Sequence, residues 1–359
     1  MARRRTTLKD VAREAGVTIS TVSRVLNNKT LTVPVTDSTK ERVFEAARTL
    51  HYMPNRLARG LAAATTQVAG MSFPMTSPLN RADHRDVTFL NLGMLISGVQ
   101  NVFQASGYEL HIFNRLEHDL NPDAPPRRMS LDFIDGLIYV EPNPKYPYFE
   151  EVVKAGLPCV LLGENPMEHP VHSVCADDFE EMRQLVSALI RKGHRRIGYL
   201  LALLNEPPMD VLKRMEGYCA AHRDAEIDVD YELIRREHVA DVPLRDSVTA
   251  LLSREPSITA LLIGRTEVAV DVLGMVQEAG IRVPEDLEIV VVGDDRFFSA
   301  TQPSLSAMRF DYLRIGAEAA HLLLNAVRGE VDEATSISVP WGFMERESCR
   351  LKEFLRTPS

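Results

Sequence analysis

The sequence predicts an α/β protein with a small N-terminal helix-turn-helix domain and a larger body of two doubly wound parallel-sheet lobes. Three observations support this prediction. Apolar residues before residue 62 repeat at helical spacing. From residue 68 onward, short β-rich runs alternate with helical segments. The length of 359 residues also leaves room for a head and two domains of about 140 residues each.

The first helix of the head and the turn after it can be read from spacing alone. Four apolar residues share one helix face: Leu8, Val11, Ala12 and Ala15. Thr7 can cap this helix, with Asp10 three positions further on. Gly16 supplies the turn, because glycine adopts a left-handed backbone at little cost.

The second helix is expected to present its polar face to solvent. Thr18 can cap it. Its inward-facing residues are Val22, Val25 and Leu26. Its outward-facing residues are Ser20, Thr21 and Arg24. A helix-turn-helix presents its recognition helix to the major groove of DNA in this way.

A third helix and a short linker follow. Thr36 or Asp37 can cap the helix, and its apolar face consists of Val43, Ala46, Ala47 and Leu50. We expect it to end at residues 52–54, because the residue before a proline avoids the α region. Residues 54–62 allow only two helical turns and contain Gly60, whereas an isolated helix needs about 12–15 residues in water. The linker is therefore expected to be flexible alone and to fold on DNA.

Charge divides the chain at the same place. Residues 1–62 hold 12 Lys/Arg and 5 Asp/Glu, a balance of +7, whereas the remainder holds 29 and 45, a balance of −16. A basic head on an acidic body is typical of a nucleic-acid-binding protein whose body has another task. The alternative is an ordinary three-helix domain with a solvated basic face.

The body alternates strands and helices. The expected strands are 68–73, 109–113, 136–140, 159–162, 197–201, 260–263 and 289–292. The expected helices are 95–105, 179–192, 210–222, 268–279 and 313–327. Strands that are apolar without alternation, such as 289–292, belong to sheets buried on both faces. Two such lobes leave a cleft at the carboxyl ends of their strands, where open α/β sheets bind ligands.

The head resembles the lactose-repressor family of bacterial transcription regulators. The matching stretches are Leu8-Lys9-Asp10-Val11-Ala12, Ala15-Gly16-Val17, Ser20-Thr21-Val22-Ser23-Arg24-Val25-Leu26-Asn27 and Tyr52-Met53-Pro54-Asn55-Arg56-Leu57-Ala58-Arg59-Gly60-Leu61. The resemblance implies that bases are read by Ile19, Ser20 and Arg24. It implies contacts with the DNA backbone by Thr21, Ser23 and Asn27. It also adds Thr7, Asn55, Arg56 and Ala58 to the DNA-binding set, and makes Leu61 a wedge in the minor groove. The alternative for Leu61 is a contact with the body.

The resemblance continues through the body, where it implies an effector domain similar to periplasmic sugar-binding proteins. The matching stretches are 193–198, 278–286 and 346–348. By this resemblance Arg214 grips the effector and Asp295 accepts its hydroxyl protons, as a guanidinium and a carboxylate can do for a polar ring. The alternative is that both residues pair with each other or with the scaffold.

Arg265 departs from the family pattern. The family usually has Asn-Asp where this chain has Arg265-Thr266. If Arg265 points into the cleft, its charge favours an anionic effector such as a sugar acid or sugar phosphate. If it pairs with Glu267 or Asp294, the pocket stays neutral. A long loop at 74–86 could also cover the mouth of the cleft.

Several classes of protein are excluded by what the sequence lacks. It has no 18-residue apolar run for a membrane helix, no secretory signal, no dinucleotide fingerprint and no phosphate loop. The four cysteines are scattered, so we expect reduced core thiols. Asp177-Asp178 and Asp294-Asp295 are expected to cap helices or accept hydroxyls, and His194 to be structural. We therefore expect no catalytic residues, no metal and no cofactor.

The sequence thus predicts a ligand-responsive regulator that acts as a homodimer on double-stranded operator DNA in the bacterial cytoplasm and does not contact the membrane. The expected domains are 1–54 (DNA-binding), 55–66 (hinge), 67–350 (effector binding and dimerisation) and 351–359 (tail). The alternatives are a stand-alone sugar-binding protein and a small-molecule α/β enzyme. The first is disfavoured by the DNA-binding head and the second by the missing motifs.

Overall fold

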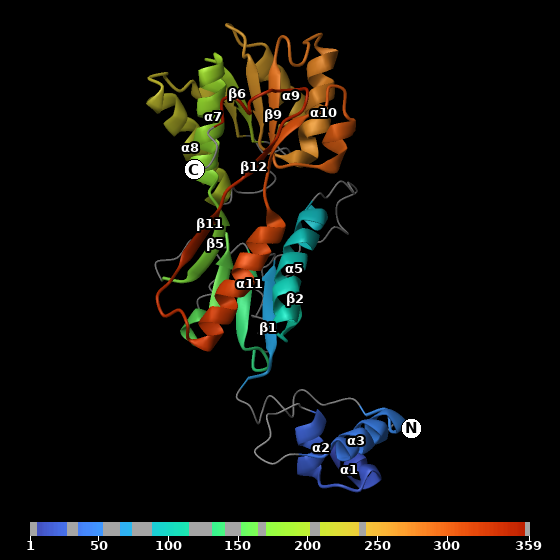
Figure 1. The fold of residues 1–359 in the computed structure, drawn as a ribbon. Helices are drawn as coiled ribbons and strands as arrows, with labels where there is room; N and C mark the ends of the chain where they lie inside the picture. Colours follow the sequence, from blue (N-terminus) through green and yellow to red (C-terminus); the bar gives the residue numbers. More distant parts are fainter. Residues whose placement is uncertain are drawn as a thin grey trace. The chain divides into compact units, whose positions relative to one another are not determined.

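The computed structural model describes residues 6–26, 35–52, 65–73, 88–114, 131–140, 152–163, 170–201, 209–236 and 242–355. The chain forms two compact units, Met1–Thr66 and Gln67–Ser359 (Figure 1). The first unit is helical in its described residues, and the second contains two six-stranded sheets. This is the predicted α/β architecture with a helical head.

The first helix of the head, α1 (Leu8–Ala15), begins and ends as predicted. The amide of Asp10 donates to the Thr7 hydroxyl at 3.4 Å, and the amide of Thr7 donates to the Asp10 carboxylate at 3.0 Å. These reciprocal bonds form a capping box. Gly16 ends the helix with φ of 64°, a conformation that costs other residues more than glycine.

The other two helices, α2 (Ile19–Leu26) and α3 (Asp37–Thr49), close a small core with α1. The amide of Thr21 donates to the Thr18 hydroxyl at 3.2 Å, so Thr18 caps α2 as predicted. Thr36 occupies the cap position of α3 but makes no side-chain cap bond. Asp37 binds Lys40 instead, at 2.8 Å. The buried core residues are Val11, Ala12, Ala15, Val22, Val25, Val43 and Ala46.

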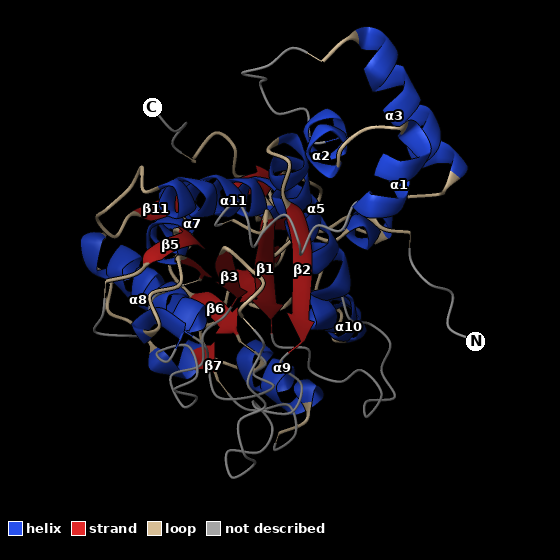
Figure 2. Cartoon of the chain, turned by 90° about the horizontal axis from the view of Figure 1, so that it is seen from below, coloured by secondary structure: helices blue, strands red, loops and turns tan. Residues whose placement is uncertain are grey.

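The first lobe of the second unit is built on a fully parallel sheet. Its strands are β1 (Val68–Phe73), β2 (Glu109–Asn114), β3 (Gly136–Val140), β4 (Cys159–Leu162), β5 (His172–Ala176) and β11 (Ser336–Val339). Their order is β11-β5-β4-β3-β1-β2. Two helices, α5 (Thr88–Ala105) and α11 (Tyr312–Arg328), cover one face together, as Figure 2 shows beside β1 and β3. The other face packs a smaller cluster around Val152.

The second lobe is doubly wound. Its strands are β6 (Ile197–Leu200), β7 (Ile234–Arg235), β8 (Ala260–Ile263), β9 (Glu288–Val292), β10 (Ser306–Arg309) and β12 (Gly342–Met344). Their order is β12-β10-β9-β8-β6-β7, and only the β10–β12 pair is antiparallel. Two helices, α7 (Asp178–Lys192) and α8 (Met209–Asp224), pack on one face. The opposite face carries α9 (Leu244–Leu252) and α10 (Thr266–Glu278).

Three crossovers join the lobes. The chain passes from β5 into α7 around Asp177, from β10 into α11 around Phe310, and from β11 into β12 through Trp341 (Figure 1). As a result β11 and α11 belong to the first lobe although they follow most of the second lobe in sequence. The chain up to Leu355 also packs on the second-lobe core, where Leu351 is fully buried.

The sequence-based expectations hold for the uniformly apolar strands and for five helices, and they miss elements that are very short or mix polar and apolar residues. All seven expected strands and five expected helices are present, with ends shifted in several cases. The missed elements are β5, β7, β10, β11, β12 and α9. The five missed strands have two to five residues each, and several mix polar and apolar residues, as in the Ser336–Val339 sequence SISV. Their pairing comes from tertiary position, because so short a run carries little periodicity.

Glycines bring helices into unusually close contact within both lobes. A Cβ on Gly98 of α5 would lie 2.1 Å from the carbonyl oxygen of Leu313 on α11. A Cβ on Gly316 of α11 would lie 2.2 Å from the carbonyl oxygen of Leu95. The backbones of α5 and α11 therefore touch where neither residue has a side chain. Gly217 of α8 approaches α7 in the same way.

Candidate DNA-reading helix and effector site

The exposed face of α2 carries the predicted base-reading residues. Ser20 and Arg24 are exposed, and Ile19 keeps 48% of its surface accessible. Thr21 and Ser23 are half-buried on the flanks of this face. A methyl-bearing side chain, a hydroxyl and a guanidinium are the groups that contact thymine methyls, base edges and guanine in the major groove.

Other predicted DNA-contacting residues have different positions. Thr7 is exposed, and its hydroxyl lies 2.7 Å from the Asp10 carboxylate within the capping box. Five lie outside the described residues: Asn27, Asn55, Arg56, Ala58 and Leu61. The described residues include only the last two residues of the hinge at 55–66 and none of the loop at 74–86. The roles of the hinge and the loop therefore stay predictions.

Arg214 of α8, which is half-buried, is the centre of a charged cluster in the second lobe. Its Nε donates to Asp178 at 2.7 Å, and its Nη2 donates to Asp210 at 2.7 Å. Burial disfavours the charged guanidinium, but the carboxylates of Asp210 and Asp178 outweigh burial and raise the pKa of Arg214 above its usual value. Arg214 thus pairs with two carboxylates of the second lobe, so its charge is compensated within the protein, and its contact with the effector stays a prediction.

Arg214 also contacts all three crossovers. Asp178 begins α7 directly after the first crossover. The guanidinium carbon lies 5.2 Å from the ring centre of Phe310 in the second crossover and 5.7 Å from that of Trp341 in the third. The two rings meet edge to face at 4.8 Å. One side chain therefore ties together the three segments about which the lobes can move.

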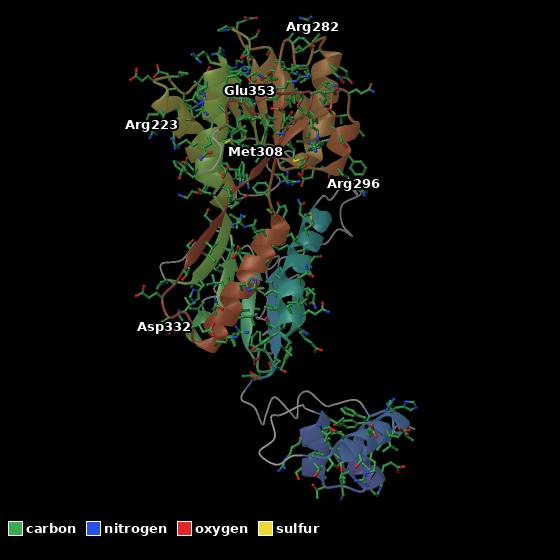
Figure 3. The ribbon with its side chains drawn as sticks, viewed as in Figure 1. Arg223, Arg282, Arg296, Met308, Asp332 and Glu353 are labelled. Atoms are coloured by element: carbon green, nitrogen blue, oxygen red, sulfur yellow. The ribbon has the colours of Figure 1, made fainter. Side chains whose placement is uncertain are left out.

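The acidic pair after β9 lies at the carboxyl-end edge of the second sheet. Asp295 is buried, and its carboxylate accepts the Phe297 amide at 2.8 Å, which caps a short 3-10 helix, Arg296–Ala300. Arg296 itself lies at this edge of the lobe (Figure 3). Asp294 lies 2.9 Å from Arg346 in an ion pair whose geometry aligns no hydrogen bond. The Asp295 carboxylate thus caps a helix and the Asp294 carboxylate pairs with an arginine.

Arg265 follows β8 at the same edge. Its Nη2 donates to the Glu267 carboxylate at 2.9 Å, one of the two pairings that would leave the pocket neutral. Both side chains remain about one-quarter exposed. The positive charge of Arg265 is therefore compensated locally.

Glu181 is a titratable group beside the third crossover. Burial raises its pKa to about 7, helped by the nearby charges of Asp177 and Glu180 and opposed by a hydrogen bond from the backbone of Trp341. The folded protein thus keeps a proton that the unfolded chain, with an ordinary glutamate pKa near 4.5, has lost. Stability should fall as the pH rises from about 4.5 through about 7.

We therefore expect the melting temperature of the wild type to fall between about pH 5 and about pH 8 more steeply than that of Glu181→Gln. Glutamine keeps the shape and an acceptor oxygen but does not titrate. Differential scanning calorimetry across this range makes the comparison. Parallel curves for the two proteins would show that Glu181 titrates normally.

His194 and the cysteines were expected to have structural roles. His194 lies 3.0 Å from Glu288 and 2.9 Å from Thr259, and Lys192 pairs with the same glutamate. All four cysteines are free thiols; two are buried, and Cys175 and Cys219 are half-buried. Among the residues that the structure describes, no group of three or more His, Cys, Asp or Glu could hold a metal ion. None of the helices in the described ranges is long and apolar enough to cross a membrane.

Sequence reasoning missed four residues around Arg214: Asp178 as its partner, Tyr199, Phe310 and Trp341. Tyr199 is fully buried and stacks on Tyr218. The available signals were weak. Trp341 is the only tryptophan in the chain, and Phe310 follows the short strand β10, which periodicity does not reveal.

Comparison with known proteins decides the family. Residues 7–55 match the family model "Bacterial regulatory proteins, lacI family", and residues 186–349 match "Periplasmic binding protein-like domain". The chain belongs to the lacI family of bacterial regulatory proteins. It is a DNA-binding transcription regulator and not an enzyme, since its curated relatives are regulators along nearly their whole length.

Two relatives illustrate the extent of the similarity. Catabolite control protein A of Priestia megaterium is 28% identical over 348 residues, which cover 96% of this chain and 99% of that protein. The transcriptional repressor PurR of Aliivibrio salmonicida is 28% identical over 330 residues, covering 91% and 94%.

Solved structures share the fold. The lac repressor dimer bound to operator and an anti-inducer matches with a TM-score of 0.74 and 21% identity, over 96% of this chain and 99% of that chain. A complex of the transcriptional regulator CelR with cellobiose matches with a TM-score of 0.64 and 25% identity, over 96% and 100%. The two-lobed body of this lacI-family regulator thus has the same fold as these solved regulators.

Proposed function

We propose that this regulator is a repressor that binds a pseudo-palindromic operator as a dimer, in the bacterial cytoplasm, under the control of a small polar metabolite held between its two lobes. The observation that carries the proposal is the exposed face of α2, where Ile19, Ser20 and Arg24 project from a capped and packed helix. The basic charge of residues 1–62 supports the same conclusion.

A dimer is favoured because one recognition helix covers only half of a typical operator. Two identical heads related by a two-fold axis read two inverted half-sites. The lac repressor, which shares this fold, was solved as a dimer on its operator. The hinge at 55–66, with Leu61 as a wedge in the minor groove, remains part of the proposal.

The effector is proposed to lie at the carboxyl ends of the strands, where open parallel sheets bind ligands. Three arginines at this edge already have carboxylate partners: Arg214 has two, and Arg265 and Arg346 have one each. This balance supports an uncharged, hydroxylated ligand over the sugar acid or phosphate considered from sequence. The CelR structure contains cellobiose, a ligand of this class.

Binding is proposed to change the angle between the lobes. Lobes joined by three crossovers move as rigid bodies, so a bound ligand selects one angle over others. In a dimer this motion alters the spacing of the two hinges and thereby the affinity for the operator.

We expect Arg24→Ala to weaken specific binding by about 1–3 kcal/mol and to relax the preference at one base pair in each half-site, if Arg24 contacts guanine. Gel-shift titrations on a selected site and on its single-base variants measure both effects. The control is Arg48→Ala, which removes the same charge from the exposed face of α3 and should leave the base preference unchanged. An unchanged preference in Arg24→Ala would contradict the assignment.

For the effector, we expect calorimetry with neutral sugars and the matching sugar acids to favour the neutral members, with the preference unchanged in Arg265→Ala. Glu267→Gln is the informative control, because it frees Arg265 and should improve binding of the acid. A wild type that prefers the acid and loses this preference in Arg265→Ala would restore the anionic alternative.

A further inference from the structure

Trp341 occupies the junction of the two lobes. It follows β11 of the first sheet and precedes β12 of the second, so it lies within the third crossover. Its ring packs edge to face on Phe310 at 4.8 Å, and the Arg214 guanidinium lies 5.7 Å from its centre. Only 8% of its surface is exposed. The indole is therefore held where all three crossovers meet.

The indole N–H of Trp341 is buried, and among the residues that the structure describes it has no hydrogen-bond acceptor. The hydroxyl of Tyr199, which is fully buried and lies within the electrostatic reach of Arg214, has none there either. Buried tryptophan and tyrosine side chains normally find a partner, because an unsatisfied buried polar group costs free energy. Two such groups beside one arginine are therefore unusual and point to a role for the free donor.

The neighbouring acceptors are already engaged. The carboxylates of Asp178 and Asp210 accept hydrogen bonds from Arg214. Glu181 accepts a hydrogen bond from the backbone N–H of Trp341. The indole N–H of the same residue takes no part in that bond. A phenylalanine would provide an aromatic ring here without a polar atom to satisfy. Burying the indole N–H therefore costs free energy in this state, and no described neighbour offsets that cost with a hydrogen bond.

The position of the two rings suggests what the donor serves. Phe310 directly follows β10 of the second sheet, and Trp341 follows β11 of the first sheet after one proline. Both therefore come from carboxyl ends of strands, one from each lobe, which is the edge where open sheets bind ligands. Ligand sites of this kind combine aromatic walls with a few placed polar groups.

We propose that the indole N–H of Trp341 is a hydrogen-bond donor to the effector, and that Trp341 and Phe310 form an aromatic wall against its ring. The ligand class is an uncharged cyclic polyol with an apolar ring face and hydroxyl or ring oxygens as acceptors. This inference rests on the proposed effector function. Because the indole lies in a crossover, movement of the lobes onto a ligand also moves this donor.

The first test measures the unliganded protein. Trp341→Phe removes the unsatisfied N–H together with part of the buried ring, so its melting temperature should lie closer to that of the wild type than to that of Trp341→Ala. Trp341→Ala is the control for packing and should melt several degrees lower. If Trp341→Phe melts clearly below the wild type by an amount that Tyr199→Phe reproduces, the N–H already has a partner, such as a buried water, and the proposal is overturned. A fall in Trp341→Phe alone that exceeds about half of the fall in Trp341→Ala overturns it equally, since the indole is then structural.

The second test uses D-glucose, D-galactose, D-ribose, cellobiose and D-gluconate as probes. For any sugar that raises the melting temperature of the wild type, binding should change the emission of Trp341, the only tryptophan. Trp341→Phe should bind that sugar at least about tenfold more weakly while keeping its affinity for random-sequence DNA. Unchanged sugar affinity in Trp341→Phe would overturn the proposal. If no probe affects the wild type, the effector proposal fails for these sugars, and the stability comparison alone decides the role of Trp341.

Discussion

Raising the salt concentration from about 50 to about 200 mM should weaken binding of the full-length protein to random-sequence duplex DNA by about 10³-fold or more. Each phosphate neutralised by lysine or arginine releases counterions, and a protein with 6–10 phosphate contacts loses about 10³–10⁵ in affinity over this range. The 12 basic residues in each 62-residue head can supply that many contacts in a dimer. Fluorescence anisotropy at several salt concentrations gives the slope.

The control for this experiment is Arg282→Ala. Arg282 is exposed in the acidic unit, where it pairs with Asp286 (Figure 3). Its removal changes the net charge of the protein but should leave the slope unchanged, because the acidic unit is not expected to meet phosphate. A wild-type affinity that is insensitive to salt would rule out the basic head as the DNA-binding surface.

Gly98→Ala should lower the free energy of unfolding by about 1–3 kcal/mol, because the new methyl group has no room. Its Cβ would lie 2.1 Å from the carbonyl oxygen of Leu313, so α5 and α11 would have to move apart. These two helices form much of the first-lobe core. Thermal and urea unfolding followed by circular dichroism measure the loss.

Gly93→Ala is the matched control in the same helix. A Cβ at Gly93 meets nothing within 4 Å. Alanine is the better helix former, so this change should stabilise the protein by about 0.5–1 kcal/mol. Equal effects of the two substitutions would mean that α5 and α11 do not touch through Gly98.

The head could be predicted closely because its determinants are local. The box between Thr7 and Asp10, the turn at Gly16 and the cap at Thr18 each involve residues within three or four positions. The apolar strands that are buried on both faces could be predicted equally well. In a sequence that alternates strands and helices, a short uninterrupted apolar run such as the one within Glu288–Val292 is typical of a strand buried on both faces.

The surroundings of Arg214, in the proposed effector site, were harder to predict because the contacting residues are distant in sequence. Arg214 pairs with Asp178, 36 residues away, and packs against Phe310 and Trp341 from two later crossovers. Only the topology brings these segments together. For Arg265, the sequence left two orientations open, because its long side chain can reach either Glu267 or the cleft. In the structure, Arg265 pairs with Glu267.

The central claim is that α2 reads a two-fold symmetric DNA site, and selection from a random-sequence duplex library tests it most directly. Full-length protein is incubated with the library, bound DNA is recovered and sequenced over several rounds, and the enriched site is footprinted. The account predicts two inverted half-sites with centres about 10 base pairs or one further helical turn apart, protected symmetrically. No enriched sequence, or a single asymmetric site with one-sided protection, would contradict it.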